Sequence, residues 1–404
     1  MAAQWTPMRW PSAWKDPAAV NLLKGTAIDC LVLGAGDDLA EVRSRARDAG
    51  LHVVDAATPP AGISVIKGVW PGVKGGRAAR TEAGPTGVPW VDSNGWTIQL
   101  ARRQHPEVQV WVDAAPAADA VVTADSYLIA IADSAAYGGR WIVSLDAPLA
   151  AAMAAHKPEA DKPWNRIKQA AAFFAAHQAW SEYAPFAVVG VVSDFTGANE
   201  FFSQEMLNLL ARAGQHYRIL PKKEPFSTEG LRALLYADAE PLTPALQKQI
   251  LEFVEAGGML ITDQWPALSQ GAVPAPVDTF SVYAIGKGKI AVSKDPPSDP
   301  YVWANDSVVL ISHRYDLVRF WNGGATGSYY TLSPDRKQAV VHALFYSYRG
   351  PDQASVRVAG HYRTARAATV ESPQLAGVQV KVEKDAVEIH LPRISQYVAL
   401  ELDV

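Results

Sequence analysis

The sequence predicts an α/β protein in three parts: a short or incomplete (β/α) TIM-type barrel, a flavodoxin-like α/β domain and a C-terminal antiparallel β-sandwich. Strand-like and helix-like segments alternate up to residue 184, and a second alternating unit follows from 185 to 297. Residues 298–404 show mainly the period-two pattern of half-buried strands. The expected domains are therefore 1–184, 185–297 and 298–404.

Five short apolar runs in the first part are expected to be parallel strands, because each is rich in β-branched or aromatic residues. The runs are IDCLVL (28–33), LHVVDA (51–56), ISVIKGVW (63–70), VQVWVDA (108–114) and RWIVSLD (140–146). Helical patterns at 38–50 and 124–139 lie between them, and MRWPSAWKDP (8–17) is expected to pack against one side of the barrel with Trp10 and Trp14 buried. The alternation suits either an open doubly wound sheet or a barrel.

Polar residues at the ends of these runs favour the barrel, whose active site lies at the carboxyl edge of its strands. Asp55, Lys67, Asp113 and Asp146 occupy such ends. The same recurrence also arises where aspartates cap the helices that follow. Both interpretations stay open on the sequence alone.

The second part begins at Pro185, after an amphipathic helix expected at 164–183. Strands are expected at 186–194, 217–220, 233–238 and 259–262, with helices at 199–214 and 242–258. Thr243 and Pro244 form a helix start, as N-cap and first-turn residues. In the third part, a helix at 304–322 leads into alternating segments separated by Gly, Pro and Asp turns, which predict the sandwich.

Composition excludes several classes of function. The formal net charge is −4 at pH 7 and no long basic run occurs, so a nucleic-acid partner is not expected. No uninterrupted apolar window of about 18 residues occurs, so no membrane span is expected. The start MAAQWTP lacks the features of a signal peptide, which predicts a cytoplasmic protein, or a periplasmic or secreted one if a leader has been removed.

Cofactor and metal sites are also not expected. LVLGAGDDL (31–39) departs from the dinucleotide fingerprint, because Leu39 takes the place of the third small residue and two aspartates stand where a pyrophosphate would bind. Cys30 is the single cysteine, and the histidines show no metal-ligand spacing. The absence of a cysteine from the second part also argues against glutamine amidotransferase chemistry there.

The order of segments resembles that of glycoside hydrolase family 42, the β-galactosidases. Three stretches carry the resemblance: VVSDFTGANEFFSQEMLNLL, ILEFVEAGGMLIT and VEIHLPRISQYVALEL. It implies a carbohydrate substrate and a middle domain, related in fold to class I glutamine amidotransferases, that assembles the chain into a homo-oligomer, a trimer or a dimer. The family's acid/base glutamate follows an asparagine after a barrel strand, whereas the one Asn-Glu pair here, Asn199-Glu200, lies in the second part. The family's catalytic residues therefore do not transfer.

Aspartates at the carboxyl edge are the remaining candidates, because glycoside hydrolysis uses two carboxylates. Asp92, Asp113 and Asp146 are the candidate catalytic residues, with roles unassigned, and Asp55 and Glu82 are further carboxylates near that edge. A helix cap or loop hydrogen bond is the alternative for each. The expected substrate-binding residues, aromatic rings for sugar faces and polar groups for hydroxyls or an acidic sugar, are Arg9, Lys67, Trp70, Trp90, Asn94, Trp96 and Trp111, with Lys74 nearby.

The stretch GPTGVPWVDSNGW (84–96) is expected to be an edge loop that turns its aromatic and polar side chains to one cleft. The sequence thus predicts a glycoside hydrolase. Two alternatives remain: a non-catalytic carbohydrate-binding or scaffold protein on a degenerate barrel, and an oligomeric structural protein.

Overall fold

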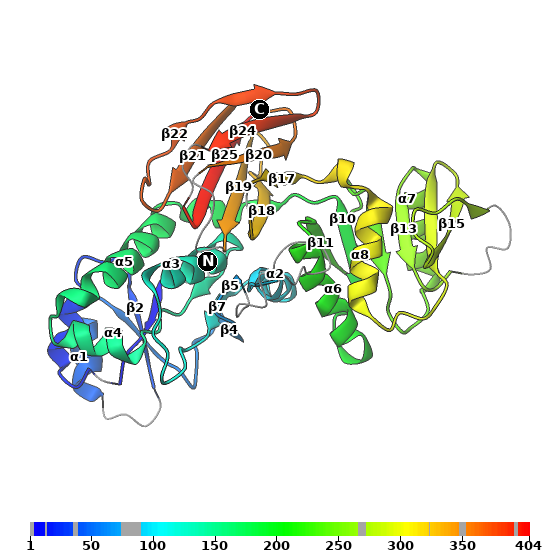
Figure 1. Ribbon diagram of the computed structural model, residues 1–404. Coiled ribbons are helices and arrows are strands. Elements are labelled where there is room, and N and C mark those ends of the chain that lie inside the picture. Colours follow the sequence, from blue (N-terminus) through cyan, green and yellow to red (C-terminus); the bar gives the residue numbers. More distant parts are fainter. Residues whose placement is uncertain are drawn as a thin grey trace.

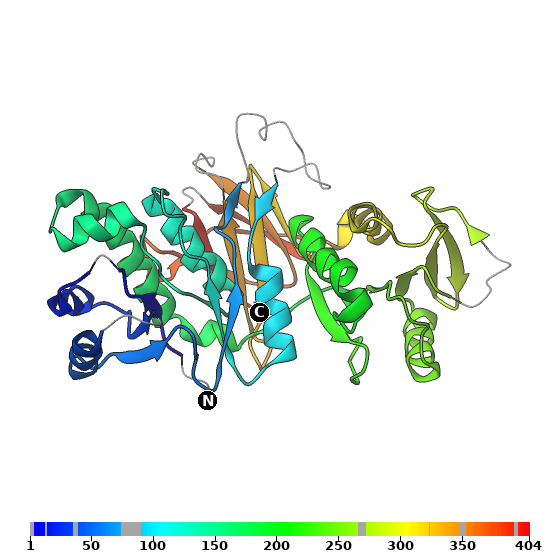
Figure 2. The same cartoon turned by 90° about the horizontal axis from the view of Figure 1, so that it is seen from below.

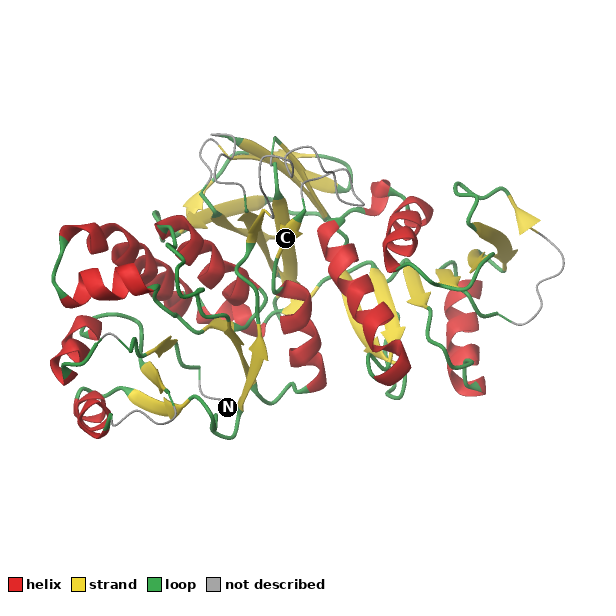
Figure 3. Ribbon diagram, turned by 60° about the horizontal axis from the view of Figure 1, so that its bottom comes forward, coloured by secondary structure: helices red, strands yellow, loops and turns green. Residues whose placement is uncertain are grey.

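The computed structural model describes residues 4–12, 14–34, 39–73, 90–265, 272–322, 324–346, 353–391 and 395–404. Two α/β parts lie side by side, and a β-rich C-terminal part sits over their junction (Figure 1). Figure 2 gives the view from below, and Figure 3 shows the chain with helices in red and strands in yellow. Among the described residues, no helix is both long enough and apolar enough to cross a bilayer.

The first part contains six parallel strands in two hydrogen-bonded groups, β1-β2-β3 and β4-β7-β8. Its elements are β1 (Pro7–Arg9), η1 (Pro17–Leu23), β2 (Cys30–Leu33), α1 (Ala40–Asp48), β3 (His52–Asp55), β4 (Ile63–Lys67), β5 (Gly72–Val73), β6 (Val91–Asp92), α2 (Gly95–Gln104), β7 (Gln109–Asp113), α3 (Ala124–Ala136), β8 (Arg140–Trp141), α4 (Ala147–Ala154), η3 (Pro158–Ala160), α5 (Asp161–Ala176) and η4 (Gln178–Glu182). β5 and β6 form a separate antiparallel pair.

Val143, just after β8, joins the two groups of strands. Its N–H donates to Pro7 O at 3.0 Å, and its carbonyl accepts from Arg9 N at 2.8 Å. The strand order is therefore β4-β7-β8-β1-β2-β3, a cyclic shift of the chain order such as neighbouring strands of a (β/α) barrel show, and the described residues form no pairing between β3 and β4 that would close the sheet. We call this unit barrel-like and its six strands the barrel strands.

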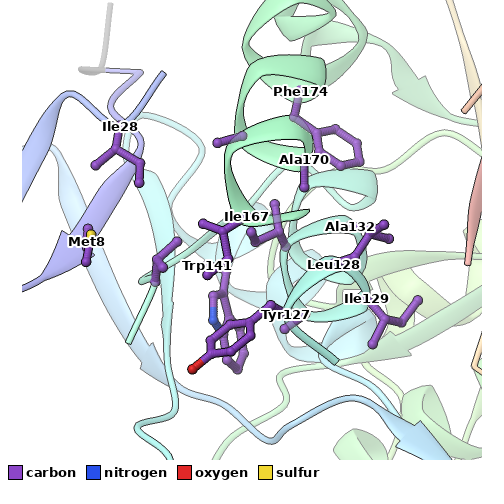
Figure 4. Close-up of a cluster of buried hydrophobic side chains, with 14 of the residues drawn as sticks. Met8, Ile28, Tyr127, Leu128, Ile129, Ala132, Trp141, Ile167, Ala170 and Phe174 are labelled. Atoms are coloured by element: carbon purple, nitrogen blue, oxygen red, sulfur yellow. The ribbon is translucent and has the colours of Figure 1, made fainter. Parts of the chain in front are cut away.

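Side chains alternate between the two faces of these strands, and both faces are buried. The inner cluster contains Cys30, Val32, Val54, Ile63, Trp111 and Ile142. On the outer face, Met8 and Trp141 belong to the same buried cluster as Leu128 of α3 and Ile167 of α5 (Figure 4). Burial on both faces explains why these strands form continuous apolar runs.

The middle part has a seven-stranded sheet in the order β11-β10-β12-β13-β16-β15-β14. Its first five strands are parallel and follow the doubly wound order of flavodoxin-like sheets. The elements are β10 (Val189–Ser193), η5 (Gly197–Asn199), α6 (Glu200–Arg212), β11 (Tyr217–Pro221), β12 (Ala233–Tyr236), α7 (Pro244–Glu255), β13 (Met259–Thr262), β14 (Ala272–Val273), β15 (Phe280–Ile285), β16 (Gly288–Ser293), α8 (Pro300–Ile311) and η6 (His313–Tyr315).

The C-terminal part consists of two antiparallel sheets, β17-β20-β24-β23 and β22-β21-β25-β19-β18-β9. Its strands are β9 (Ala184–Pro185), β17 (Val318–Trp321), β18 (Thr326–Leu332), β19 (Gln338–Phe345), β20 (Ala354–Ala359), β21 (Thr364–Thr369), β22 (Ala376–Gly377), β23 (Val380–Val382), β24 (Ala386–Leu391) and β25 (Tyr397–Asp403). Strand β19 is buried on both faces: Val340 and Leu344 join the core of the first part, whereas Val341 and Phe345 join the core shared by the other two parts. The six-stranded sheet therefore lies between the two cores and contributes side chains to both.

Three sequence expectations differ from the structure. The helix expected at 304–322 is wrong beyond residue 311, because Ser312 has a φ of +76° and the VRFW segment pairs as β17. The helix expected at 164–183 ends at Ala176 and continues only as the short η4. Residues 84–96 are not wholly a loop: 84–89 lie outside the described residues, but β6 and the start of α2 fall within the rest.

Candidate active site

The carboxyl end of the barrel strands carries a cluster of polar side chains that we call the mouth cluster: Arg9, Lys67, Asp113 and Ser144. Trp111 and Ile142 face the barrel interior, and side chains alternate along a strand, so Asp113 and Ser144 face the same side at the upper end. Lys67 lies beside Asp113 in the register of β4 and β7. The cluster therefore brings together residues from four strands or their ends.

Arg9 links the cluster. Its Nη2 lies 2.6 Å from Asp113 Oδ1, and its Nε donates to Ser144 Oγ at 3.3 Å. The side chains of Arg9 and Asp113 are 29% and 35% exposed, so solvent reaches the pair, whereas Ser144 is buried. Among the described residues, Asp113 is the single carboxylate of the cluster, beside two cationic groups.

Asp92 lies elsewhere, at the contact between the first and middle parts. Its Oδ1 is 3.3 Å from Nη2 of Arg212, the last residue of α6, and accepts from Trp90 Nε1 at 3.3 Å. The Arg212 guanidinium stacks on the Trp90 ring at 3.6 Å. Trp96, on α2, packs against the core shared by the middle and C-terminal parts. These contacts give Trp90, Asp92 and Trp96 a role in joining the parts of the molecule.

Asn94 is buried and links the first and C-terminal parts through Asp133. Its side chain bonds both backbone groups of Val69 and donates to Asp133 Oδ2 at 3.0 Å. The Tyr346 hydroxyl donates to Asp133 Oδ1 at 2.6 Å. Burial raises the pKa of Asp133 to about 6, although the hydrogen bonds from Tyr346 and Asn94 act in the opposite direction.

Asp146 is 2% exposed and caps α4. Its Oδ1 accepts from Leu149 N at 3.0 Å, and its Oδ2 accepts from the Tyr127 hydroxyl at 2.9 Å and Val122 N at 3.3 Å. Tyr127 in turn accepts from Asp146 N at 2.7 Å. This arrangement matches the helix-cap alternative for this residue.

Substituting Asp146 with alanine is expected to lower the free energy of unfolding by about 2 kcal/mol, since it removes a cap and leaves the buried Tyr127 hydroxyl without an acceptor. Urea unfolding measures the effect. Asp299→Ala, at the exposed cap of α8, is the matched control and should cost less. Equal losses in the two variants would contradict the buried network.

The remaining expected sugar contacts divide by burial. Trp111 is 1% exposed inside the barrel and donates to Gln109 Oε1 at 2.7 Å, so it presents no face to solvent. Trp70 is partly buried, with its ring edge-on to Tyr127 and Trp141. Lys74 and Glu82 lie outside the described residues. The structure therefore brings Arg9, Lys67 and Asp113 together and places Asp92, Asn94, Asp146 and Trp111 elsewhere.

A second polar cluster, which the sequence analysis missed, lies at the carboxyl ends of β10, β11 and β12. Lys222 Nζ lies 2.7 Å from Asp238 Oδ2, 2.6 Å from Glu240 Oε2 and 3.5 Å from Asp194 Oδ2. Ser193 Oγ donates to Asp238 Oδ1 at 2.6 Å. Two strand-like runs that end in aspartate, FAVVGVVSD and ALLYAD, carried the signal for this cluster.

Lys222 is the cation of this second cluster. The carboxylate oxygens of Asp194, Asp238 and Glu240 lie within 4.8 Å of one another, an arrangement that also suits a metal ion. Burial lowers the pKa of Lys222, but its hydrogen bonds to Asp238 and Glu240 outweigh burial and raise it. Ligands commonly bind at this edge of a doubly wound sheet, and here Lys222 and its carboxylate partners occupy it.

No protein-family model matches the sequence, and no curated protein does. Among solved structures, α-L-fucosidase isoenzyme 2 from Paenibacillus thiaminolyticus is similar, with a TM-score of 0.53 and 11% identity over 95% of this chain and 79% of the fucosidase. The chain has a glycosidase-like fold. A β-galactosidase from Rahnella sp. R3 is similar with a TM-score of 0.50 and 8% identity, over 93% of this chain and 63% of the galactosidase.

This glycosidase-like fold confirms the coarser part of the predicted resemblance. At such low identity the similarity concerns the fold alone, and the substrates of the two enzymes are not transferred to this chain. Membership of family 42 and assembly through the middle part stay predictions.

Proposed function

We propose that the protein is a glycoside hydrolase whose saccharide binds at the mouth cluster. The observation that carries this proposal is the position of Asp113, at the carboxyl end of a barrel strand in a glycosidase-like fold, with its carboxylate fixed by Arg9 at 2.6 Å. The ion pair suits Asp113 to the charged role in the reaction, as nucleophile or general base. Arg9 and Lys67 are then available to bind substrate oxygens.

Chemically, such an enzyme needs a second carboxyl group to protonate the leaving oxygen while the first attacks the anomeric carbon or activates water. Asp92 and Asp146 were the sequence candidates for that role. Both have partners in the structure, Arg212 for Asp92 and Tyr127 for Asp146, away from the mouth cluster. Asp113 is therefore the one catalytic assignment that we propose.

One observation favours a second candidate function, saccharide binding without hydrolysis. The mouth cluster holds a single carboxylate among the described residues, and that carboxylate is paired with Arg9. A site of this kind retains hydrogen-bonding groups for a sugar without the acid and base pair that cleavage requires.

Asp113→Asn is expected to reduce glycoside hydrolysis at least about 1,000-fold, because the amide supplies neither a nucleophile nor a base. Hydrolysis of a panel of aryl glycosides and reduced oligosaccharides by the purified chain is the measurement. The partly exposed ion pair that is lost contributes up to about 1 kcal/mol, so the variant should stay folded. Asp119→Asn, in the exposed loop after β7, is the matched control.

Undiminished hydrolysis by Asp113→Asn would exclude Asp113 as the catalytic carboxylate. Saccharide-dependent stabilisation of the wild-type chain without any product, lost in Arg9→Gln but kept in Asp119→Asn, would establish the binding function instead. The two candidate functions therefore give different results in the same pair of assays.

A further inference from the structure

A cleft of about 440 Å³ opens where the three parts of the molecule meet. The end of α2 supplies one wall, β11 and the loop after it supply the second, and β9 with β18 supplies the third. Figure 1 shows α2 and α6 adjacent at this junction, beneath the C-terminal sheets. The residues that line the cleft do not include the mouth cluster, so it is a separate site.

Three arginines line the cleft: Arg102, Arg103 and Arg218. Arg102 donates only to carbonyl oxygens, Tyr137 O at 2.9 Å and Ser181 O at 2.8 Å. Arg218 likewise donates to Glu229 O at 2.7 Å. Within the described parts of the chain, neither of these two guanidinium groups forms an ion pair, and the Glu229 carboxylate, which attracts Arg218 electrostatically, is itself paired with Arg336. Arg103 is the exception and pairs with Glu224 at 2.6 Å.

The backbone fixes Arg102 in place before any ligand binds. Gly138 has a φ of +80°, and a Cβ at this position would lie 2.2 Å from Arg102 Nη1. Glycine therefore provides both the left-handed turn after α3 and the space that the guanidinium occupies. With two carbonyl partners, Arg102 loses little side-chain freedom on binding an anion, which favours affinity.

Arg218 carries an unused hydrogen-bond donor. Its Nε is buried and has no partner among the described residues. A buried donor without an acceptor is unfavourable by about 1 to 3 kcal/mol. A ligand in the cleft does not reach this buried atom, but an anionic one would give the Arg218 guanidinium, which lines the cleft, a countercharge.

Aromatic rings give the cleft its apolar surface. Tyr217 and Tyr329 are almost fully buried at its base, and Tyr183 and Phe226 are partly exposed beside them. The two partly exposed rings, Tyr183 and Phe226, can pack against the C–H faces of a sugar, while the arginines select for negative charge.

We propose that this three-part cleft binds an anionic oligosaccharide, with Arg102 and Arg218 on a carboxylate or sulfate group and the rings of Tyr183 and Phe226 against the sugar faces. The saccharide identity rests on the proposed function of the barrel, whereas the need for negative charge rests on the two arginines alone. The site would hold a charged glycan chain at a distance from the mouth cluster, on the same molecule.

Isothermal titration calorimetry of the full chain in 50 mM NaCl provides the test. The probes are trigalacturonate, its methyl ester, a sulfated chondroitin disaccharide and sodium phosphate. The proposal expects at least one of the charged saccharides to bind at least about 10-fold more tightly than the neutral ester and than phosphate. Binding should weaken as salt is raised to 300 mM.

Arg102→Gln and Arg218→Gln should each weaken that binding at least about 10-fold, since each removes a charge-assisted hydrogen bond. Arg47→Gln, which removes one charge from the exposed surface of α1, is the control and should bind as the wild type does. Arg218→Lys keeps the charge and tests the site if Arg218→Gln does not fold. Circular dichroism establishes the fold of each variant.

Failure of both charged saccharides to bind, equal binding of the ester, equal binding of phosphate, or unchanged affinity in the folded variants would each overturn the proposal. Asp113→Asn distinguishes failure of this proposal from failure of the proposed function. If that variant still binds the charged saccharide, binding in the cleft is supported whether or not the wild-type chain hydrolyses a glycoside.

Discussion

Lys222→Met is expected to lower the free energy of unfolding by about 3 to 5 kcal/mol, the usual result of removing one partner from a buried ion network. The Lys222 side chain is 12% exposed and that of Asp238 only 2%, so water screens their attraction poorly. Without the lysine, the Asp238 carboxylate stays buried beside Asp194 with no countercharge. Urea unfolding at pH 7 is the measurement, with EDTA present because three close carboxylates attract divalent cations.

The neighbouring residue offers a matched control for this prediction. Lys223 is 78% exposed and lies 3.8 Å from Asp194, so Lys223→Met should change stability by less than about 1 kcal/mol. Adding Asp238→Asn to Lys222→Met should recover part of the loss, because the second substitution removes the uncompensated charge. Similar losses of stability in the two single lysine variants would contradict the prediction that burial strengthens the ion pairs of Lys222.

Asp133→Asn is expected to change how stability depends on pH. The pKa of Asp133 is raised from 3.8 to about 6 in the folded protein, so the folded state holds this proton more tightly than the unfolded chain. Its contribution is complete below about pH 4 and is lost as the pH rises through 6, which amounts to about 3 kcal/mol. The asparagine variant cannot titrate at this position, so its stability should decrease less than that of the wild type between pH 4 and 7.

Urea midpoints at intervals of one pH unit, expressed as the difference between wild type and variant, isolate the contribution of Asp133 from that of other groups. Asp125→Asn, in the first turn of the same helix, provides the comparison for the loss of a partly exposed carboxylate. A constant difference between wild type and Asp133→Asn across this range would contradict the raised pKa.

Local patterns predicted the parallel strands of both α/β parts, because strands buried on both faces must be apolar at nearly every position. β1 was missed, since its three residues, PMR, form no apolar run and include a proline. Its place as a strand depends on backbone pairing with β2 on one side and with Val143 on the other, contacts that no local pattern reveals. The β15–β16 hairpin was missed for a different reason: the flavodoxin-like domain expected from the sequence was already complete without it.

The candidate site was predicted only in part for a related reason. The rule that residues at strand ends lie at the functional edge selected Asp113, which does end β7, but it could not show that Asp146 lies beyond the end of β8 and caps α4. Nor could it show that Asp92 finds its partner in α6, far along the chain. The same rule applied to the middle part would have found Asp194 and Asp238, whereas their partner Lys222 lies at the end of a strand without an acidic signal.

The two-residue strand β9 has a consequence for the order of folding. It lies between the two α/β parts in sequence, yet it pairs with β18 of the C-terminal part, through Thr331 with Pro185 and Leu332 with Ala184. The contact between Tyr346 and Asp133 joins residues that are still farther apart along the chain. During synthesis, both contacts wait until most of the chain has left the ribosome. The packing of the first two parts against the C-terminal sheets is therefore completed last. A chain truncated before β18 would leave Asp133 without its tyrosine partner.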